Sequence, residues 1–219
     1  MNETSGDSVY DQTANLRNGY TAGADIVSGK IGNARSFVGT NSDNIAIRAG
    51  GGLNNQQTGA ITCWVKWSGT QDADIQSQGY GAITSRQKDA TFSQQIIALD
   101  AADPATGKIQ WRPYAFNVPV ITSSAATGDG TWHYLVINYS SGAHRLYVDA
   151  VSDGTATTTG SITNDINIPL SIGAWIGEGA GYSTSIIDEF RTYSDTLNQT
   201  TVDSLYALTG VTRKMRIIN

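Results

Sequence analysis

The sequence predicts an all-β protein folded as an antiparallel sandwich. In residues 61–67, ITCWVKW, apolar side chains alternate with a second set, which is the pattern of a strand with one face in a core. Residues 133–139 and 144–149 are two further strand-like runs joined by the short turn SSGA, as in a hairpin. Such runs recur at short intervals between clusters of Gly, Asn, Asp and Thr, and this spacing favours a sandwich.

Other strand-like runs and one helical pattern complete the predicted elements. The runs span residues 92–99, 108–112, 169–172 and 185–193. In residues 196–208 the side chains of Leu197, Val202, Leu205 and Leu208 fall on one helical face, and Asn198 is a candidate N-cap. A chain of 219 residues is long enough to bury a sizeable core in one domain. We therefore expect one sandwich with a short helix after its last strand.

Composition excludes several classes of function. The chain has 14 Lys and Arg against 19 Asp and Glu, a net charge of −5, and no basic stripe, which argues against nucleic-acid binding. It has no run of about 18 apolar residues, so we expect no membrane insertion. Its start lacks the pattern of a signal peptide. The single cysteine, Cys63, closes no internal disulfide, and its place in the alternation predicts a buried small hydrophobe.

The order of several motifs resembles a known family. GAITCWVKW is followed by GDGTWHYLVINYSSGAHRLYVDA and then by IIDEFRTYSDTLNQTTVDSLY. Together they resemble the laminin-G-like branch of the concanavalin A-like lectin/glucanase superfamily over about residues 2–208. The resemblance implies a jelly-roll sandwich of two large antiparallel sheets. We accordingly expect one jelly-roll domain at residues 1–209 and a C-terminal tail at 210–219.

One departure from the family concerns assembly. Members usually have an apolar strand before the segment that matches NETSGD, and here the chain begins at Met1. The sheet edge would then be open, filled by another chain, or exposed by truncation. The tail ends with the apolar pair Ile217 and Ile218, which predicts a homo-oligomer or a lattice in which a terminus contacts another chain. In the alternative, the tail folds back on a monomer.

The sequence argues against catalysis. Glucanases of the superfamily carry paired strand carboxylates in an E-x-D-x-E pattern, and this chain has none. Asp72 and Asp74 have a suitable spacing but fall in a polar loop, while the adjacent Asp188 and Glu189 point to opposite faces of a strand. His133 and His144, on the two strands of the hairpin, form either a metal or acid–base pair or, as we favour, two structural side chains.

A structural calcium ion is the one cofactor that the resemblance suggests. Several relatives hold an ion between the chain start, a loop after the second strand and an Asp of the last strand. The matching positions here are Glu3, Gly39 and Asp188. Calcium accepts carboxylate and carbonyl oxygens in a flexible shell. In the alternative, Asp188 only accepts backbone hydrogen bonds, and Asp43 is a lesser candidate for a surface site.

The candidate ligand-binding residues are aromatic. Trp64 lies on the strand face of Thr62 and Lys66, opposite the apolar set, so Trp64 and Lys66 are predicted to line an outer face. Tyr80 and Trp175 fall in or near loops, whereas alternation places Trp111 in the core. The competing interpretation is that these aromatic rings cover the sandwich and bind nothing.

These observations predict a non-catalytic binding or adhesion module that recognises a glycan or a protein on a surface. The start at Met1 and the lack of an export signal favour a second hypothesis, a structural decoration or spike subunit of a viral particle. A glycoside hydrolase ranks third. Both leading hypotheses place the protein outside the cell, on a cell surface or on a virion.

Overall fold

A computed structural model describes residues 3–13, 16–47, 57–68, 80–87, 93–100, 107–112, 120–157, 169–175 and 181–208. The predicted tail at 210–219 and the loop residues Asp72 and Asp74 lie outside these ranges. Within the described ranges, no helix has both the length and the apolar character needed to cross a membrane.

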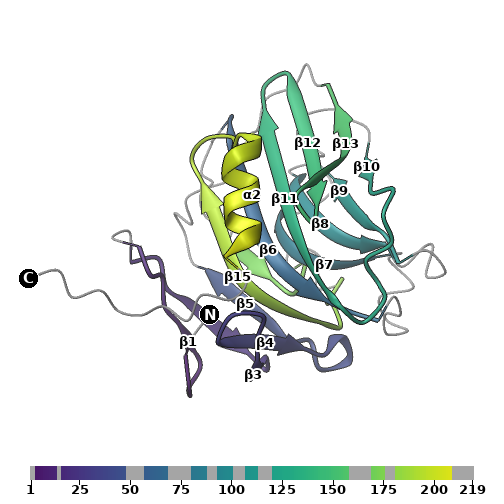
Figure 1. Ribbon diagram of the computed structural model, residues 1–219. Coiled ribbons are helices and arrows are strands. Elements are labelled where there is room, and N and C mark those ends of the chain that lie inside the picture. Colours follow the sequence, from purple (N-terminus) through teal and green to yellow (C-terminus); the bar gives the residue numbers. More distant parts are fainter. Residues whose placement is uncertain are drawn as a thin grey trace, which may run out of the picture.

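The described strands form two antiparallel sheets, which confirms the predicted sandwich (Figure 1). The eight-stranded sheet contains, in spatial order, β1 (Ser8–Val9), β2 (Gly19–Ala22), β5 (Asn44–Ile47), β14 (Leu170–Ile172), β7 (Tyr80–Gln87), β8 (Ser93–Asp100), β9 (Ile109–Arg112) and β10 (Ile121–Thr122). The seven-stranded sheet contains β13 (Val151–Ala156), β12 (Ala143–Val148), β11 (Trp132–Ser140), β6 (Gly59–Lys66), β15 (Ser185–Tyr193), β4 (Asn33–Phe37) and β3 (Asp25–Ser28). A 3-10 helix, η1 (Gly39–Asn41), precedes β5, and α2 (Gln199–Ala207) follows β15.

The core lies between the two sheets and follows the predicted alternation. Along β6, the inward side chains of Ile61, Cys63 and Val65 are at most 1% exposed. Trp111, on β9 of the other sheet, is 0% exposed, as predicted. Burial raises the pKa of the Cys63 thiol to about 12, so this thiol stays protonated and behaves as a small hydrophobe.

The outer face of the seven-stranded sheet is covered by α2 (Figure 1). The helix begins after the predicted cap and inside the predicted range of 196–208: the Asn198 side chain accepts a hydrogen bond from the Thr201 backbone N–H. The segment before it is fixed by Asn138 of β11, whose side chain both donates to the Leu197 carbonyl and accepts from the Leu197 N–H. Val202 then packs fully buried against the sheet.

The free edge of β1 is capped by side chains of the same chain. The buried Arg35 of β4 donates to the carbonyls of Gly6 and Ser8, at 3.2 and 3.5 Å, and to that of Ala24 at 3.1 Å. The Glu3 carboxylate accepts from the Tyr10 N–H at 2.8 Å. At the edge that we expected to be open or filled by another chain, the carbonyls of Gly6 and Ser8 and the N–H of Tyr10 therefore already have hydrogen-bond partners.

The opposite end of the sandwich is closed by Asp153 of β13. Its carboxylate accepts from the N–H groups of Ser124 and Ala125, in the loop between β10 and β11, at 2.9 and 3.0 Å. Gly154 lies so close to β10 that a Cβ there would be 2.5 Å from Ile121, so this position needs glycine. The two sheets are thus joined at both ends by polar contacts as well as by the core.

Replacing Arg35 with Met should destabilise the fold, because three backbone carbonyls, two of them at the edge of β1, lose their donor. We expect the free energy of unfolding to fall by about 2 kcal/mol or more. Urea denaturation measures this change, and the matched control is Arg17→Met at an exposed position. Equal stability of the two variants would contradict the capping role.

Candidate binding surfaces

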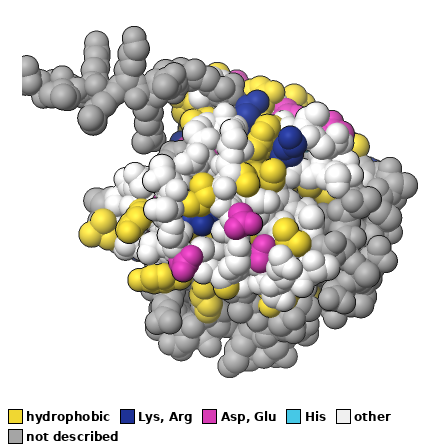
Figure 2. Space-filling view, turned by 90° about the horizontal axis from the view of Figure 1, so that it is seen from below, with side chains coloured by type: hydrophobic (Ala, Val, Ile, Leu, Met, Phe, Trp, Pro, Cys, Tyr) yellow, Lys and Arg dark blue, Asp and Glu magenta, His cyan; other side chains and the backbone are white. Residues whose placement is uncertain are grey.

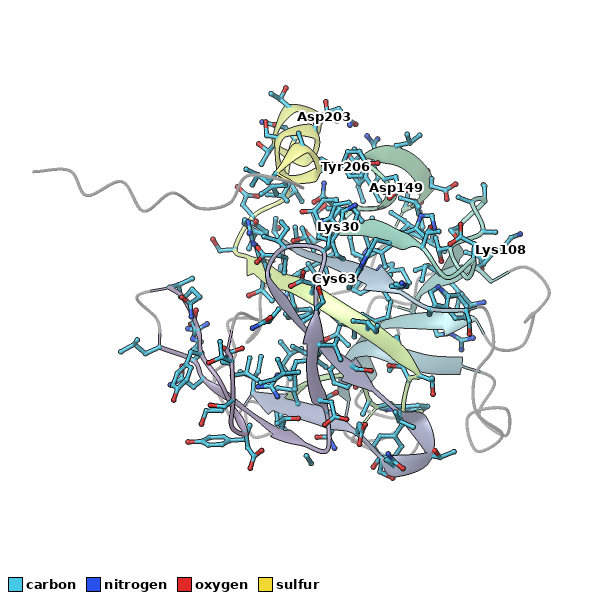
Figure 3. All side chains as sticks on the ribbon, turned by 60° about the horizontal axis from the view of Figure 1, so that its bottom comes forward. Lys30, Cys63, Lys108, Asp149, Asp203 and Tyr206 are labelled. Atoms are coloured by element: carbon cyan, nitrogen blue, oxygen red, sulfur yellow. The ribbon has the colours of Figure 1, made fainter. Side chains whose placement is uncertain are left out.

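Trp64 faces the predicted side of the sheet, but the expectation that its ring lines a solvent-facing surface is wrong. The side chain is 2% exposed. Tyr206 of α2 stacks on it at a centroid distance of 5.5 Å, and Tyr134 contacts it at 5.1 Å. The ammonium group of Lys30, in the turn between β3 and β4, lies 4.6 Å from the ring centroid. Figure 3 shows Lys30 and Tyr206 on the same side of the sheet.

The structure does not gather the other predicted ligand residues around Trp64. Lys66, the half-buried last residue of β6, pairs with Trp132 and Ile186 in the seven-stranded sheet. Trp175 is 6% exposed and follows β14 of the other sheet. Tyr80 begins β7, and its side chain lies outside the described part of the chain.

Exposed apolar side chains concentrate instead near β1 and β2. Six large hydrophobic residues of the described chain are exposed, and three of them fall between residues 10 and 20: Tyr10 at 57%, Leu16 at 74% and Tyr20 at 59%. In the view from below, hydrophobic side chains stand out in small separate groups (Figure 2). Sequence reasoning missed Tyr10 and Tyr20 because neither lies in a long strand pattern.

The two exposed tyrosines lie on the same face of the eight-stranded sheet. Val9 points into the core, so Ser8 and Tyr10 point outward. Tyr20 pairs with Ser8 and therefore shares that face. Continued register places Tyr10 diagonally across from Tyr20, which corresponds to a backbone spacing of about 7 to 8 Å.

Asp11 organises the loop between these tyrosines. Its carboxylate accepts hydrogen bonds from the N–H groups of Thr13 and Arg17, at 2.8 and 2.9 Å. Although partial burial acts to raise it, these hydrogen bonds lower the pKa of Asp11 overall. Asn18 accepts from the Asp11 N–H at 3.0 Å, so both ends of the loop are tied together. These hydrogen bonds therefore hold the chain segments that directly follow Tyr10 and precede Tyr20.

The predicted calcium ligands divide between two places. Asp188 is 0% exposed, and its carboxylate accepts from the N–H groups of Ile31 and Glu189 at 2.8 and 2.7 Å. The backbone carbonyl of Glu3 accepts from the Asn33 side chain at the same turn. Continued register pairs Asp188 with Ala34 of β4. Gly39 lies past the other end of β4, five residues beyond Ala34, which corresponds to about 16 Å of extended chain.

Gly39 therefore does not join Glu3 and Asp188 in one site. Its N–H donates to the Thr184 hydroxyl at 3.0 Å. The lesser candidate, Asp43, is 3% exposed and accepts from the Val38 N–H, so it is not at the surface. Among the described residues, no cluster of three or more His, Cys, Asp or Glu side chains is arranged for a metal ion.

The two histidines lie in different environments, in line with the structural interpretation. His144 pairs with Tyr139, which is six residues and about 20 Å along β11 from His133. The Trp111 indole N–H donates to the His144 Nδ1 at 3.1 Å, and burial lowers the pKa of His144 to about 4. His133 instead contacts two aspartates, Asp129 and Asp149.

The adjacent carboxylates Asp188 and Glu189 are each engaged by other parts of the fold. Asp188 is enclosed beneath the turn between β3 and β4, where a Cβ on Gly29 would lie 2.6 Å from its carboxylate. Glu189 forms an ion pair with Arg191 instead. Their surroundings differ from those of two carboxylates that face one cleft, as in a hydrolase.

Solved structures with the same fold include several binding domains. The binding domain of Paraclostridial Mosquitocidal Protein 1 superposes with a TM-score of 0.73 at 16% identity, over 93% of this chain and 50% of that one. Domain 4 of AbnA, a GH43 extracellular arabinanase from Geobacillus stearothermophilus solved with arabinotriose, gives 0.65 at 19% identity, over 90% and 92%. The receptor-binding domain of botulinum neurotoxin type G gives 0.63 at 16%, over 92% and 50%.

The chain thus spans about half the length of the two toxin domains and nearly all of the arabinanase domain. At these identities the likeness establishes the fold alone. No curated protein sequence matches the chain. A family model described as "Concanavalin A-like lectin/glucanases superfamily" matches residues 39–203, which is most of the chain. The chain therefore belongs to the concanavalin A-like lectin/glucanase superfamily.

Proposed function

We propose that this chain is a non-catalytic module that recognises a neutral glycan displayed on a surface. The observation that carries the proposal is the exposed pair of Tyr10 and Tyr20 on one face of the eight-stranded sheet. Aromatic rings bury large apolar areas while their hydroxyl groups stay able to hydrogen-bond, which suits the mixed surface of a sugar. Arg17 is the single basic side chain of the loop between them, so an acidic glycan finds no cationic cluster.

Two further observations support this proposal. The fold is that of binding domains, and one similar domain of matching length was solved with a trisaccharide. The enclosed Asp188 and the paired Glu189 disfavour hydrolysis at the adjacent carboxylates. Because the similar domains come from toxins and an extracellular enzyme, we place the module outside the cell or on a surface.

Protein recognition and a structural role in a virion are the competing functions. The capped edge of β1 removes one reason to expect assembly by strand addition at residues 6–10. Assembly through the tail stays a prediction, because residues 210–219 lie outside the described ranges. The glycan proposal is preferred because a similar domain of matching length was solved with a trisaccharide.

A glycan array probed with the full chain tests this function. We expect binding to neutral oligosaccharides, with recovery of the bound glycan intact. Tyr10→Ala and Tyr20→Ala should each weaken binding about tenfold, which corresponds to about 1.4 kcal/mol of lost contact. The control is Val151→Ala, another exposed apolar position but on β13 of the other sheet, which should bind like the unmodified chain.

Two results would refute the proposal. One is a folded protein that binds no glycan on the array. The other is full affinity in both tyrosine variants, which would separate glycan binding from this surface. Turnover of a bound glycan would contradict the non-catalytic assignment.

We further propose one structural calcium ion, held near the turn between β3 and β4. The buried Asp188 carboxylate is in none of the ion pairs among the described residues, and burial raises its pKa. The Glu3 Oε2 atom is buried and has no hydrogen-bond partner. The Asp188 carboxylate and the backbone carbonyl of Glu3 contact the turn at 29–33, and both are oxygen ligands of the kind that calcium prefers. The ion would offset the cost of the buried negative charge on Asp188.

Thermal unfolding in calcium and in chelator tests this second proposal. Because only the folded chain assembles the ligands, calcium at a hundredfold excess over its Kd should raise the Tm by about 5 to 10 °C. Asp188→Asn should abolish this increase, whereas the exposed Asp25→Asn should preserve it. The same Tm in calcium and in chelator for the unmodified chain would reject the ion.

A further inference from the structure

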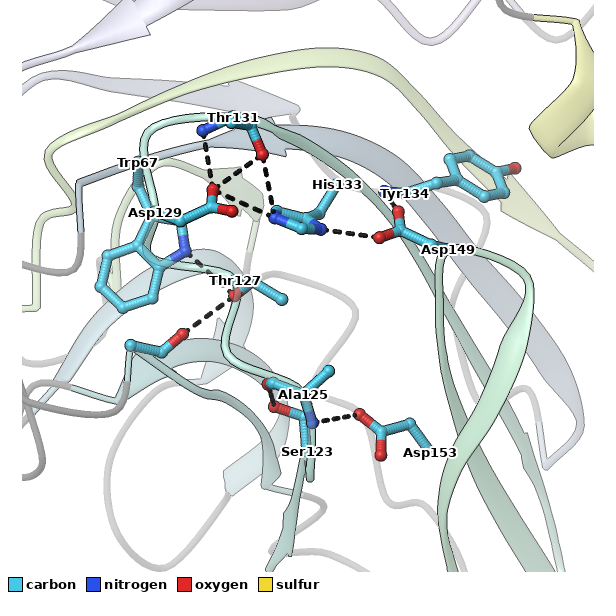
Figure 4. Close-up of polar contacts among 11 residues, drawn as sticks. Trp67, Ser123, Ala125, Thr127, Asp129, Thr131, His133, Tyr134, Asp149 and Asp153 are labelled. Atoms are coloured by element: carbon cyan, nitrogen blue, oxygen red, sulfur yellow. Dashed lines mark hydrogen bonds and ion pairs between the residues drawn. The ribbon is translucent and has the colours of Figure 1, made fainter.

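His133 joins two segments that are distant in sequence (Figure 4). Its Nδ1 lies 2.7 Å from Asp149 Oδ2, in the turn between β12 and β13. Its Nε2 lies 3.2 Å from Asp129 Oδ1, in the loop between β10 and β11. The ring therefore bridges a loop before its own strand and a turn after the next strand.

Both carboxylates are held in place by contacts other than the histidine. Asp129 Oδ1 accepts from the backbone N–H and the hydroxyl of Thr131, at 2.8 and 2.7 Å. These bonds, with a smaller contribution from His133, lower the pKa of Asp129 to about 2, so it stays charged. Asp149 Oδ1 accepts from the Tyr134 N–H at 2.8 Å, and the Asp149 backbone has a φ of 51°.

Fixed carboxylates at both ring nitrogens make the bridge depend on a proton. A protonated imidazole donates from both nitrogens, whereas a neutral one donates from only one. In the neutral ring, one nitrogen therefore turns its lone pair toward an oxygen that also carries negative charge. The hydroxyl of Thr131, 3.2 Å from Nε2, offers that nitrogen another partner, but it already donates to Asp129.

The charges around His133 also favour its protonated form. Of the described charged groups, Asp149 and Asp129 act on the ring, and both are negative. Lys30, in the turn between β3 and β4, acts on Asp149 and helps keep it ionised. The hydrogen bond to Asp149 raises the pKa of His133 more than partial burial lowers it, and Asp129 adds to the increase.

The bridged segments themselves contact other parts of the fold. Thr127, in the loop between β10 and β11, accepts from the Trp67 indole and donates to the Gly107 carbonyl, each at 3.1 Å. The turn after β12 contacts α2, because the Gln199 side chain donates to the Ala150 carbonyl at 2.8 Å. A bond between loop and turn thus connects one end of the sandwich to its covering helix.

We propose that His133 is a proton-operated latch that fixes the loop between β10 and β11 against the turn between β12 and β13. When protonated, the ring donates to Asp129 and Asp149 and closes the latch. On loss of the proton, one of the two bonds is lost and the loop loosens at residues 129–131. Because the pKa is raised on folding, this stabilisation is complete below pH 6.5 and disappears as the pH rises through the folded-state pKa of His133.

Proton NMR on the full chain tests the latch directly, because the chain has two histidines. His144, with its pKa near 4, stays neutral between pH 5.5 and 9, so the ring that titrates in that interval is His133. We expect its titration midpoint above 6.5. Hydrogen exchange of the Thr131 and Tyr134 amides, corrected for intrinsic rates, should accelerate about threefold or more as the pH rises past that midpoint.

Two variants and one control separate a latch from a merely structural histidine. His133→Gln should remove the pH dependence of exchange, and Asp129→Asn, at a half-exposed position, should lower the titration midpoint of His133. Asp153→Asn alters another carboxylate that holds the same loop and should preserve the pH dependence. A midpoint at or below 6.5, or unchanged pH dependence in His133→Gln, would overturn the proposal.

Discussion

The burial of β6 on both faces is the constraint on which the other features of this fold depend. Every residue of β6 except Lys66 is buried, which a strand facing the core on one side alone does not require. The second face needs a cover, and α2 and the turn at 29–32 provide it over Trp64 and Asp188. A surface that alternation offered as a binding face thereby becomes a second core.

Edge capping is the second general feature of the molecule. A sandwich of two open sheets exposes backbone groups at its edges, and such groups pair readily with other chains. Here Arg35 and Glu3 form hydrogen bonds with these backbone groups at β1, and Asp153 fixes the loop next to β13. The side chains that close the sandwich at these two ends are thus charged ones.

The proposed glycan surface and the proposed latch use separate regions of the sandwich. The exposed tyrosines belong to β2 and the end of β1, at one edge of the eight-stranded sheet. The His133 bridge lies at the β10 and β13 end, where the two sheets approach each other. A change of pH that loosens the bridge would therefore act on the loop between β10 and β11, away from the aromatic pair.

The sequence by itself determined the elements that depend on local order. Strict alternation set β6 and placed Cys63 in the core, and Asn198 capped α2 because capping involves only the next few residues. Only the tertiary structure decided which outer face is covered, that Gly39 lies far from Asp188, and that Asp149 meets His133. Alternation tells which side of a sheet a residue faces, but what packs on that side depends on strand register and on distant segments.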